Sequence, residues 1–256
     1  MPEKKKNQLH QLLSVEPDLR TKATKILQET IATFSKKSDH FDGFSRVYEP
    51  LQEEEGVVTR RVAPELKHVV TTVTEKINYT VKSIVSAIDA QISKEETNAS
   101  GGAKAELTVG MIDFGEWSAQ ALLALESQLI KIRAIYVAIP TLDPAKRWEL
   151  DPNSNDIYTT PENEVYKTEK RAKVITLAPP TKEHPAQTQL INIDQQVGVI
   201  KVVHNSGRIT PKLKSEYLGR VDKLIIAVKK ARSQANQVEV VNKKIGRKLF
   251  DYINNG

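Results

Sequence analysis

The chain has 256 residues, no cysteine, and 38 Lys or Arg against 32 Asp or Glu, which gives a net charge of +6. The missing cysteine excludes disulfide scaffolds, Cys-ligated zinc, iron–sulfur clusters and thiol catalysis. No apolar run approaches the ~20 residues that span a bilayer, and Met1–Lys6 is basic without the apolar stretch of a signal peptide behind it. We therefore expect a cytoplasmic protein that has no membrane partner.

The first element that the chain predicts is a helix over Glu16–Lys36, where apolar residues recur every three or four positions. Pro17 is expected in its first turn, where a missing N–H costs nothing. The period is lost over Ser38–Gly56. That segment is predicted to be a loop with a short strand at Phe44–Tyr48.

A second helix is predicted to begin after Pro64 and to reach Ile92. Its many β-branched residues lower helix propensity, so the part beyond Asn78 is predicted either as helix or as strand. Asn98–Gly102 is typical of a linker, and Ala105–Met111 alternates as a strand does.

The most hydrophobic helix is predicted over Glu116–Tyr136 and ends before Pro140. Because it is apolar on almost every side, it belongs at the centre of a core or in an oligomer interface. We predict the centre of the core, packed by the helices Glu16–Lys36 and Pro211–Ser233. Self-association is then expected to use the β-rich region and the termini.

The following seventy residues favour strands. Asp151–Asp156 is rich in turn-forming residues and lies between short apolar segments that contain Trp148 and Tyr158, which predicts a hairpin. Further strands are predicted at Ala172–Leu177, Thr188–Ile193 and Val197–His204. Helices return over Pro211–Ser233 and Val240–Ile253.

The order of helices, then strands, then helices indicates an α+β fold and not alternating βαβ units. We expect a single domain of residues 1–256. Residues 1–140 are mainly helical in this prediction, 141–210 form a β-rich middle region with a hairpin and short antiparallel strands, and 211–256 form a basic C-terminal helical pair.

Sequence motifs for catalysis are largely missing. The chain has no phosphate loop, no dinucleotide-binding glycine motif and no GxSxG elbow, and its five histidines have no metal-ligand spacing. We expect no cofactor and no metal. Glu183 and His184, which precede Pro185 between two predicted strands, are the one pair with the character of an acid/base group, although no nucleophile lies nearby in the sequence.

Positive charge is concentrated at the C-terminal end. From Lys201 onward there are 13 Lys or Arg and 4 Asp or Glu, so the first 200 residues carry a small negative balance. Two basic faces are predicted on the last two helices, formed by Lys212, Arg220, Lys223 and Lys230 and by Lys243, Lys244, Arg247 and Lys248. Such faces bind nucleic-acid phosphates or an acidic subunit surface, and they are also typical of a solvated helix.

Several short runs resemble a known family. They are Gly43–Tyr48, Thr141-Leu142-Asp143-Pro144 followed by Trp148, Thr181–Gln187, and Lys244–Tyr252. Together they resemble an uncharacterised family of bacterial and phage-encoded proteins of similar length. The resemblance covers most of the chain and implies one architecture, but it implies no activity.

Three functions follow as hypotheses. The first is a non-enzymatic structural protein that acts through homo-oligomeric self-assembly, with a basic region of one subunit meeting an acidic surface of another. The alternative is a nucleic-acid-binding accessory protein that uses the C-terminal helices. The third is a hydrolase or transferase built around Glu183 and His184, so the chain is not excluded as an enzyme, although the missing motifs favour the non-enzymatic functions.

Overall fold

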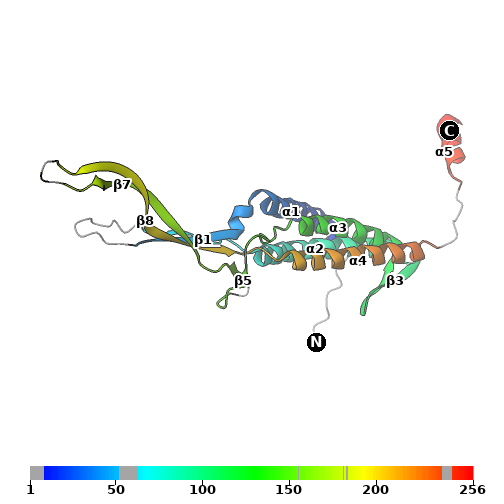
Figure 1. Cartoon of the computed structure of the whole chain (residues 1–256). Coiled ribbons are helices and arrows are strands. Elements are labelled where there is room, and N and C mark those ends of the chain that lie inside the picture. Colours follow the sequence, from blue (N-terminus) through cyan, green and yellow to red (C-terminus); the bar gives the residue numbers. More distant parts are fainter. Residues whose placement is uncertain are drawn as a thin grey trace. The chain divides into compact units, whose positions relative to one another are not determined.

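A computed structural model describes residues 9–51, 63–154, 156–180, 182, 184–237 and 244–255, and Figure 1 labels its elements. The chain divides into two compact units. One consists of Met1–Leu27, Lys82–Val137 and Glu216–Gly256, and the other of Gln28–Val81 and Ala138–Ser215. The predicted α+β fold is confirmed, because the chain has both helices and antiparallel sheets.

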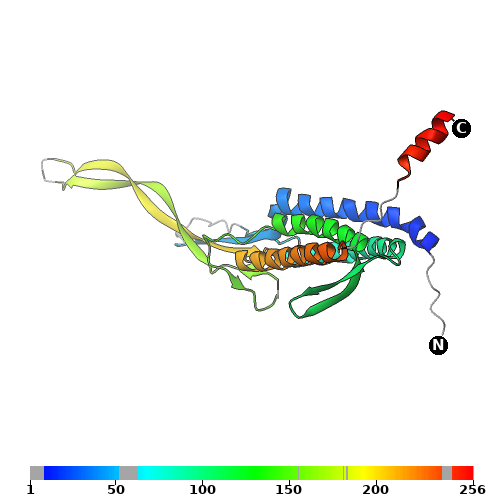
Figure 2. The same ribbon diagram turned by 90° about the vertical axis from the view of Figure 1, so that its right-hand side faces the viewer.

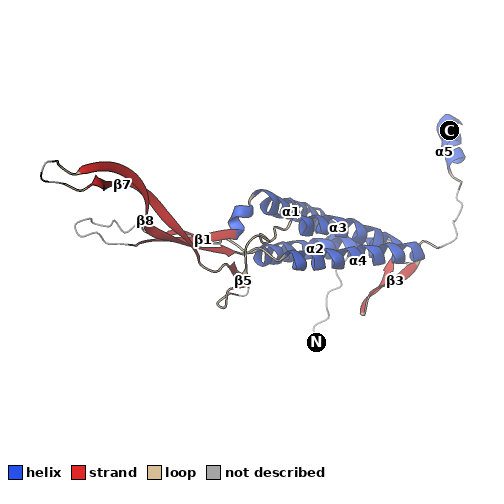
Figure 3. Cartoon of the chain, viewed as in Figure 1, coloured by secondary structure: helices blue, strands red, loops and turns tan. Residues whose placement is uncertain are grey.

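The helices are α1 (Leu9–Lys36), α2 (Val73–Asn98), α3 (Ala119–Ala138), α4 (Pro211–Ala235) and α5 (Gly246–Asn255), which Figure 3 shows in blue. The boundaries of the two units fall inside helices, so α1, α2 and α4 contribute residues to both, and α3 contributes its last residue, Ala138, to the second. Among the described residues, no helix is both long enough and apolar enough to span a bilayer.

Local signals in the sequence explain where these helices begin. Thr72 and Glu75 form a capping box before α2: the Glu75 N–H donates to the Thr72 hydroxyl (3.1 Å), and the Thr72 N–H donates to the Glu75 carboxylate (2.9 Å). The Ser118 hydroxyl accepts the Ala121 N–H at the start of α3 (3.2 Å). Pro211 lies in the first turn of α4, where it needs no partner.

The first unit buries its apolar side chains between helices and a hairpin. Its main cluster comprises Leu107, Leu122, Leu129, Val221, Ile225, Val228, Ala231 and Ala235. A second cluster joins Ile92 of α2 to Ala121 and Ala124 of α3. The hairpin consists of β3 (Lys104–Val109) and β4 (Ile112–Ser118), and Gly110 has the positive φ that its tight turn requires (+63°).

The second unit contains a six-stranded antiparallel sheet. Its strands are β1 (Asp42–Pro50), β2 (Glu65–Lys67), β5 (Glu149–Leu150), β6 (Tyr158–Thr159), β7 (Asn163–Ala178) and β8 (Gln187–Ser206). The strand β8 is central, since it pairs with β1, with β6 and with β7. The predicted hairpin around Asp151–Asp156 is confirmed as β5 and β6.

Several sequence expectations are wrong in detail. The strand predicted at Phe44–Tyr48 is confirmed, but it is longer than expected (β1, Asp42–Pro50), and a 3-10 turn (Ser38–Phe41) precedes it where a loop was predicted. Pro17 lies inside α1 and not in its first turn, because the helix starts already at Leu9. The stretch beyond Asn78 is helix throughout α2, which shows that the apolar stripe outweighs the low propensity of its β-branched residues.

The bounds of several other elements also differ from the prediction. The chain over 116–118 belongs to β4, so the central helix starts at Ala119. The strands predicted at Ala172–Leu177 and Thr188–Ile193 are parts of much longer ones, β7 and β8. The last helix is present as α5, while its predicted first residue, Val240, lies outside the described residues.

Candidate assembly surfaces and a polar pocket

The strands β7 and β8 form a long twisted ribbon, which Figure 2 shows in yellow and green. The strand β1 reaches Gly198, where it pairs through Pro50, and the N–H of the next residue, Leu51, donates to the Val197 carbonyl (3.2 Å). Within the described chain, residues 187–196 of β8 therefore pair with β7 alone. We call residues 168–178 of β7 and residues 187–196 of β8 the ribbon. It is a two-stranded structure with no further strand beside it in the part of the chain that the structure describes.

The ribbon exposes apolar side chains. Val174 and Leu190 are directly opposite each other on the two strands, and 60% and 67% of their surfaces are exposed. Because side chains alternate between the faces of a strand, Ile175, Ile191 and Ile193 lie on the other face, where they are half-buried. An apolar pair on an exposed ribbon is a surface that a further chain can cover.

Where the ribbon leaves the wider sheet, the Tyr48 ring packs against Gly198, and we call this place the packed point. A Cβ atom on Gly198 would lie 2.2 Å from the Tyr48 ring, so only glycine lets this ring lie across the strand. The Tyr48 hydroxyl donates to the Val197 carbonyl (3.3 Å), and the Lys167 ammonium lies 5.6 Å from the ring centroid. Val197 is the extra residue of a β-bulge, a feature that bends and twists a strand. The direction of the ribbon is therefore set here.

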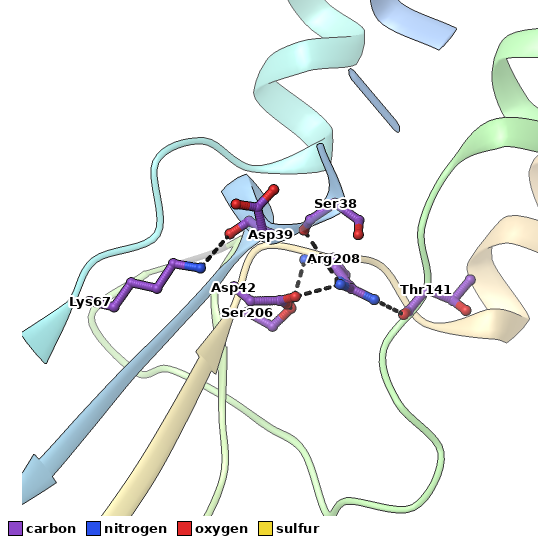
Figure 4. A network of polar contacts seen from close by, with 7 residues as sticks. All are labelled: Ser38, Asp39, Asp42, Lys67, Thr141, Ser206 and Arg208. Carbon is purple, nitrogen blue, oxygen red and sulfur yellow. Dashed lines mark hydrogen bonds and ion pairs between the residues drawn. The ribbon is translucent and has the colours of Figure 1, made fainter. Parts of the chain in front are cut away.

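A polar network fixes the other end of β8, and Figure 4 shows its side chains. The Arg208 guanidinium pairs with the Asp42 carboxylate, and it also donates to the carbonyls of Thr141 and Ser38 (both 3.4 Å). Asp42 in turn shares a hydrogen bond with the buried Ser206 hydroxyl (3.0 Å). One side chain thus joins three segments that are far apart in the sequence.

A pocket of about 220 Å³ lies beside this network, inside the second unit. Its lining residues are Asp42, Gly43, Asp143, Lys146, Trp148, His204, Asn205, Ser206 and Arg208. The Trp148 indole N–H donates to the Asp143 carbonyl (2.8 Å), which fixes the ring at the wall. The Asp143 carboxylate accepts the Ala145 N–H (3.0 Å), so it is engaged in its own turn. We call this site the Arg208 pocket.

The electrostatic environment of His204 in this pocket is cationic. Burial lowers the pKa of its imidazole most, and the positive charges of Lys146 and Arg46 lower it further, while Asp42 acts in the opposite direction. The imidazole of His204 is able to hydrogen-bond a ligand, and a bound anion would favour its protonated form.

The basic face predicted on α4 is exposed. Lys212, Arg220, Lys223 and Lys230 all lie at the surface, and Arg220 pairs with Glu216 one turn earlier (3.7 Å). Lys223 and Lys230 line a groove of about 370 Å³ between α4 and β3. The structure thus places two of the predicted residues at one concave surface.

The described basic residues of the last helix segment, Lys244, Arg247 and Lys248, are exposed too, whereas Lys243 lies outside the described residues. The apolar side chains of the same segment, among them Leu249 and Phe250, are also exposed. The helix α5 is therefore amphipathic, and none of its described side chains is buried.

The acid/base pair proposed from the sequence is only partly described. His184 is exposed in the connection between β7 and β8, and Glu183 lies outside the described residues. The enzyme hypothesis stays a prediction. Among the described residues, no group of three or more His, Asp or Glu is placed to hold a metal ion.

The central helix α3 is packed by α4 as predicted, but it is not enclosed on all sides. Leu122 and Leu129 are buried against α4, and Ala121 is buried against α2. Leu123, Ile130 and Val137, at seven-residue intervals, are about half exposed. The helix is apolar on almost every side, and one of these sides, formed by these three residues, is not covered by any of the described residues.

Comparison with family models gives a match over residues 6–255 to a family described as Family of unknown function (DUF7873). The chain belongs to this family. Comparison with curated proteins and with solved structures gave no match. Membership in DUF7873 agrees with the resemblance to an uncharacterised family and assigns no activity to any residue.

Sequence reasoning missed the Arg208 pocket. Its residues come from segments near 42, 143 and 204, and no local spacing connects these segments. The strand predicted from Val197 ends at His204, whereas β8 continues to Ser206, so the sequence did not place these two side chains on one strand.

Proposed function

We propose that the protein is a non-enzymatic, cytoplasmic structural protein that acts through homo-oligomeric assembly, and that the ribbon is the assembly element. The observation that carries this proposal is the exposed pair of Val174 and Leu190 on a two-stranded ribbon. A two-stranded structure is only marginally stable alone in water, and a third strand or a packed face stabilises it. A second copy of the chain supplies either one. The lack of cysteine suits a reducing compartment.

The edges of the ribbon support the same proposal. Within the described residues, each strand of the ribbon pairs with the other along one edge, and its second edge pairs with no strand. Such free edges are able to extend a sheet by accepting a strand from another chain. The ribbon also carries several basic side chains, among them Lys170, Arg171 and Lys173, which limit pairing to a partner of suitable charge.

Sedimentation velocity between low and high micromolar concentration tests the proposal. We expect the wild-type chain to self-associate and the variant with both Val174→Asp and Leu190→Asp to stay monomeric with an unchanged circular dichroism spectrum. Met111→Asp is the matched control, because Met111 is fully exposed at the β3–β4 turn. A wild-type chain that is strictly monomeric, or a ribbon variant that assembles like the wild type, would refute the proposal.

The cysteine-free chain allows a second measurement. Leu190→Cys introduces a single thiol on the ribbon, and Met111→Cys introduces one at the control site. We expect mild oxidation to cross-link Leu190→Cys chains in pairs if ribbons meet ribbons, and to leave Met111→Cys chains uncross-linked. Light scattering at low and high salt then shows how far the charge contrast between the C-terminal region and the rest of the chain contributes.

A second candidate function is nucleic-acid binding, which the groove beside α4 favours. Lys223 and Lys230 line this groove. Changing both to Glu should weaken DNA or RNA binding, and the same change at Lys244, Arg247 and Lys248 should weaken it further. For duplex DNA the log affinity falls by about 0.9 per phosphate contact per log unit of salt. No retention on a nucleic-acid column at low salt would count against this function.

A further inference from the structure

The Arg208 pocket contains hydrogen-bond donors without partners among the described residues. The Nε–H of Arg208 is buried and unpaired, although the two terminal nitrogens of the same guanidinium are engaged. The Lys146 ammonium has no ion pair there, and it lies close enough to His204 to lower the pKa of the imidazole. Asn205 adds an amide to the same lining. The residues that carry these donors, Lys146, Asn205 and Arg208, come from two segments and line one pocket.

We propose that the Arg208 pocket binds a small phosphomonoester, with its phosphate held by Lys146, His204 and Arg208 and its organic part against Trp148. Separate single donors suit a tetrahedral phosphate, whose oxygens point in several directions. A carboxylate is bound best by a free guanidinium fork, and the fork of Arg208 is already occupied by Asp42 and backbone carbonyls. The site is independent of the assembly proposed above.

The charges in the lining permit an anion. Asp42 is neutralised by Arg208 and hydrogen-bonded to Ser206, while the Asp143 carboxylate caps its own turn. Among the described residues neither Lys146 nor Asp143 forms an ion pair, and of these two lining side chains Lys146 is the one that can donate to an anion. Around His204 the groups that act on the imidazole are Lys146, Arg46 and Asp42, of which two are positive. A bound phosphate would supply the negative charge that Lys146 and His204 lack as a partner.

The volume of the Arg208 pocket indicates a ligand larger than a phosphate ion. About 220 Å³ exceeds the space of one phosphate, and the remaining wall is formed by the Trp148 indole, whose orientation is fixed by its bond to the Asp143 carbonyl. A planar or apolar group of modest size fits against such a ring. The ligand class is therefore a phosphate ester with a small body and not a polyphosphate.

Two probes separate the two parts of the site. Inorganic phosphate tests the donors, and phenyl phosphate tests the donors together with Trp148. By calorimetry on the full chain, we expect phenyl phosphate to bind more tightly than phosphate, and Trp148→Ala to remove the difference. Lys146→Gln should weaken both by about tenfold, the value of one charge-assisted hydrogen bond. Lys212→Gln, an exposed lysine outside the pocket, is the matched control and should change neither affinity.

The imidazole of His204 provides a direct readout. An anion favours the protonated form, so saturating phosphate should raise the pKa of His204 as followed by its C2–H resonance, and Lys146→Gln should remove that response. Sulfate, which does not titrate near neutral pH, should bind less tightly as the pH rises through the pKa of His204. An unchanged pKa of His204, or equal loss of binding in Lys146→Gln and Lys212→Gln, would overturn the proposal. Equal affinities for phosphate and phenyl phosphate in the wild type would overturn the assignment of Trp148.

Discussion

Replacing Leu129 by aspartate tests whether α3 is a core helix. Leu129 is 7% exposed and belongs to the same buried cluster as Leu122, Val221 and Val228. Leu123, on the same helix, is 53% exposed. The same substitution at both positions therefore compares a buried face with an exposed face of one helix, with the helix propensity of the new residue held constant.

The expected magnitudes differ widely. Burying a leucine side chain contributes about 1.5–3 kcal/mol, and Leu129→Asp loses this contribution. The carboxylate also enters an apolar cluster without a partner, which costs several kcal/mol even if its pKa rises so that it becomes neutral. The two losses approach the whole stability of a typical domain, about 5–15 kcal/mol. Leu123→Asp places its charge in water and should change stability by roughly 0.5 kcal/mol or less.

Urea unfolding followed by circular dichroism, with size-exclusion chromatography at the same concentrations, distinguishes the outcomes. We expect Leu129→Asp to be unfolded or to aggregate, and Leu123→Asp to unfold at nearly the wild-type midpoint. If Leu129→Asp gives a folded and soluble monomer, the buried face of α3 is an assembly interface, and the arrangement of the first unit described above is wrong.

Two further predictions concern polar contacts. Burial raises the pKa of the Glu96 carboxyl, but hydrogen bonds from Lys104 (2.6 Å between Nζ and Oε1) and Ser118 outweigh burial and hold that pKa below its usual value. The stability that ionised Glu96 contributes is therefore present at neutral pH and lost as the pH falls through its folded pKa, so Glu96→Gln should lower the urea midpoint at pH 7 more than at pH 3. Arg208→Met leaves the Asp42 carboxylate and two carbonyls without their donor, and should cost about 1–3 kcal/mol in the same assay. An unchanged midpoint would show that water replaces the guanidinium.

The sequence predicted the positions of the helices well because each carries apolar residues at helical spacing, but several starts were wrong: α1 begins at Leu9 and not at Glu16, and α2 begins at Val73 and not directly after Pro64. Pro211 begins α4 as predicted, and the low propensity of the residues after Asn78 did not prevent α2 from continuing. Those residues are helical because Ile84, Ala87 and Ile92 are buried on one face. Tertiary burial outweighs intrinsic propensity, which amounts to less than about 1 kcal/mol per residue.

The strands were harder to predict for two physical reasons. The strand β4 carries exposed residues at nearly every position, so no alternation marks it, and its last residues run into the apolar pattern of α3. The ribbon strands are long because they pair with each other in register, and such pairing is non-local information. The apolar runs at Ala172–Leu177 and Thr188–Ile193 therefore indicated only the ends of β7 and β8 next to their connection, and Val197–His204 indicated the other end of β8 as a separate strand.

Of the two candidate sites, one could be predicted from the sequence and the other could not. The basic face of α4 was predictable, because helical spacing alone places Lys223 and Lys230 on one side. The Arg208 pocket was not, because it depends on Asp42, Trp148 and His204 meeting through the sheet. A pocket assembled by tertiary structure from three separate segments leaves no spacing for a motif search to find.

The strand β8 links the ribbon to the Arg208 pocket within one unit, and this arrangement makes the two proposals separable by experiment. Leu190 lies toward one end of β8 and His204 toward the other, with the packed point at Gly198 between them. If β8 is rigid there, Lys146→Gln should leave the sedimentation profile unchanged. If phosphate alters assembly, linkage requires that assembly alter phosphate affinity by the same factor, because the coupling free energy is shared. Measuring phosphate affinity below and above the assembly concentration therefore decides whether the pocket only binds its ligand or also regulates the ribbon.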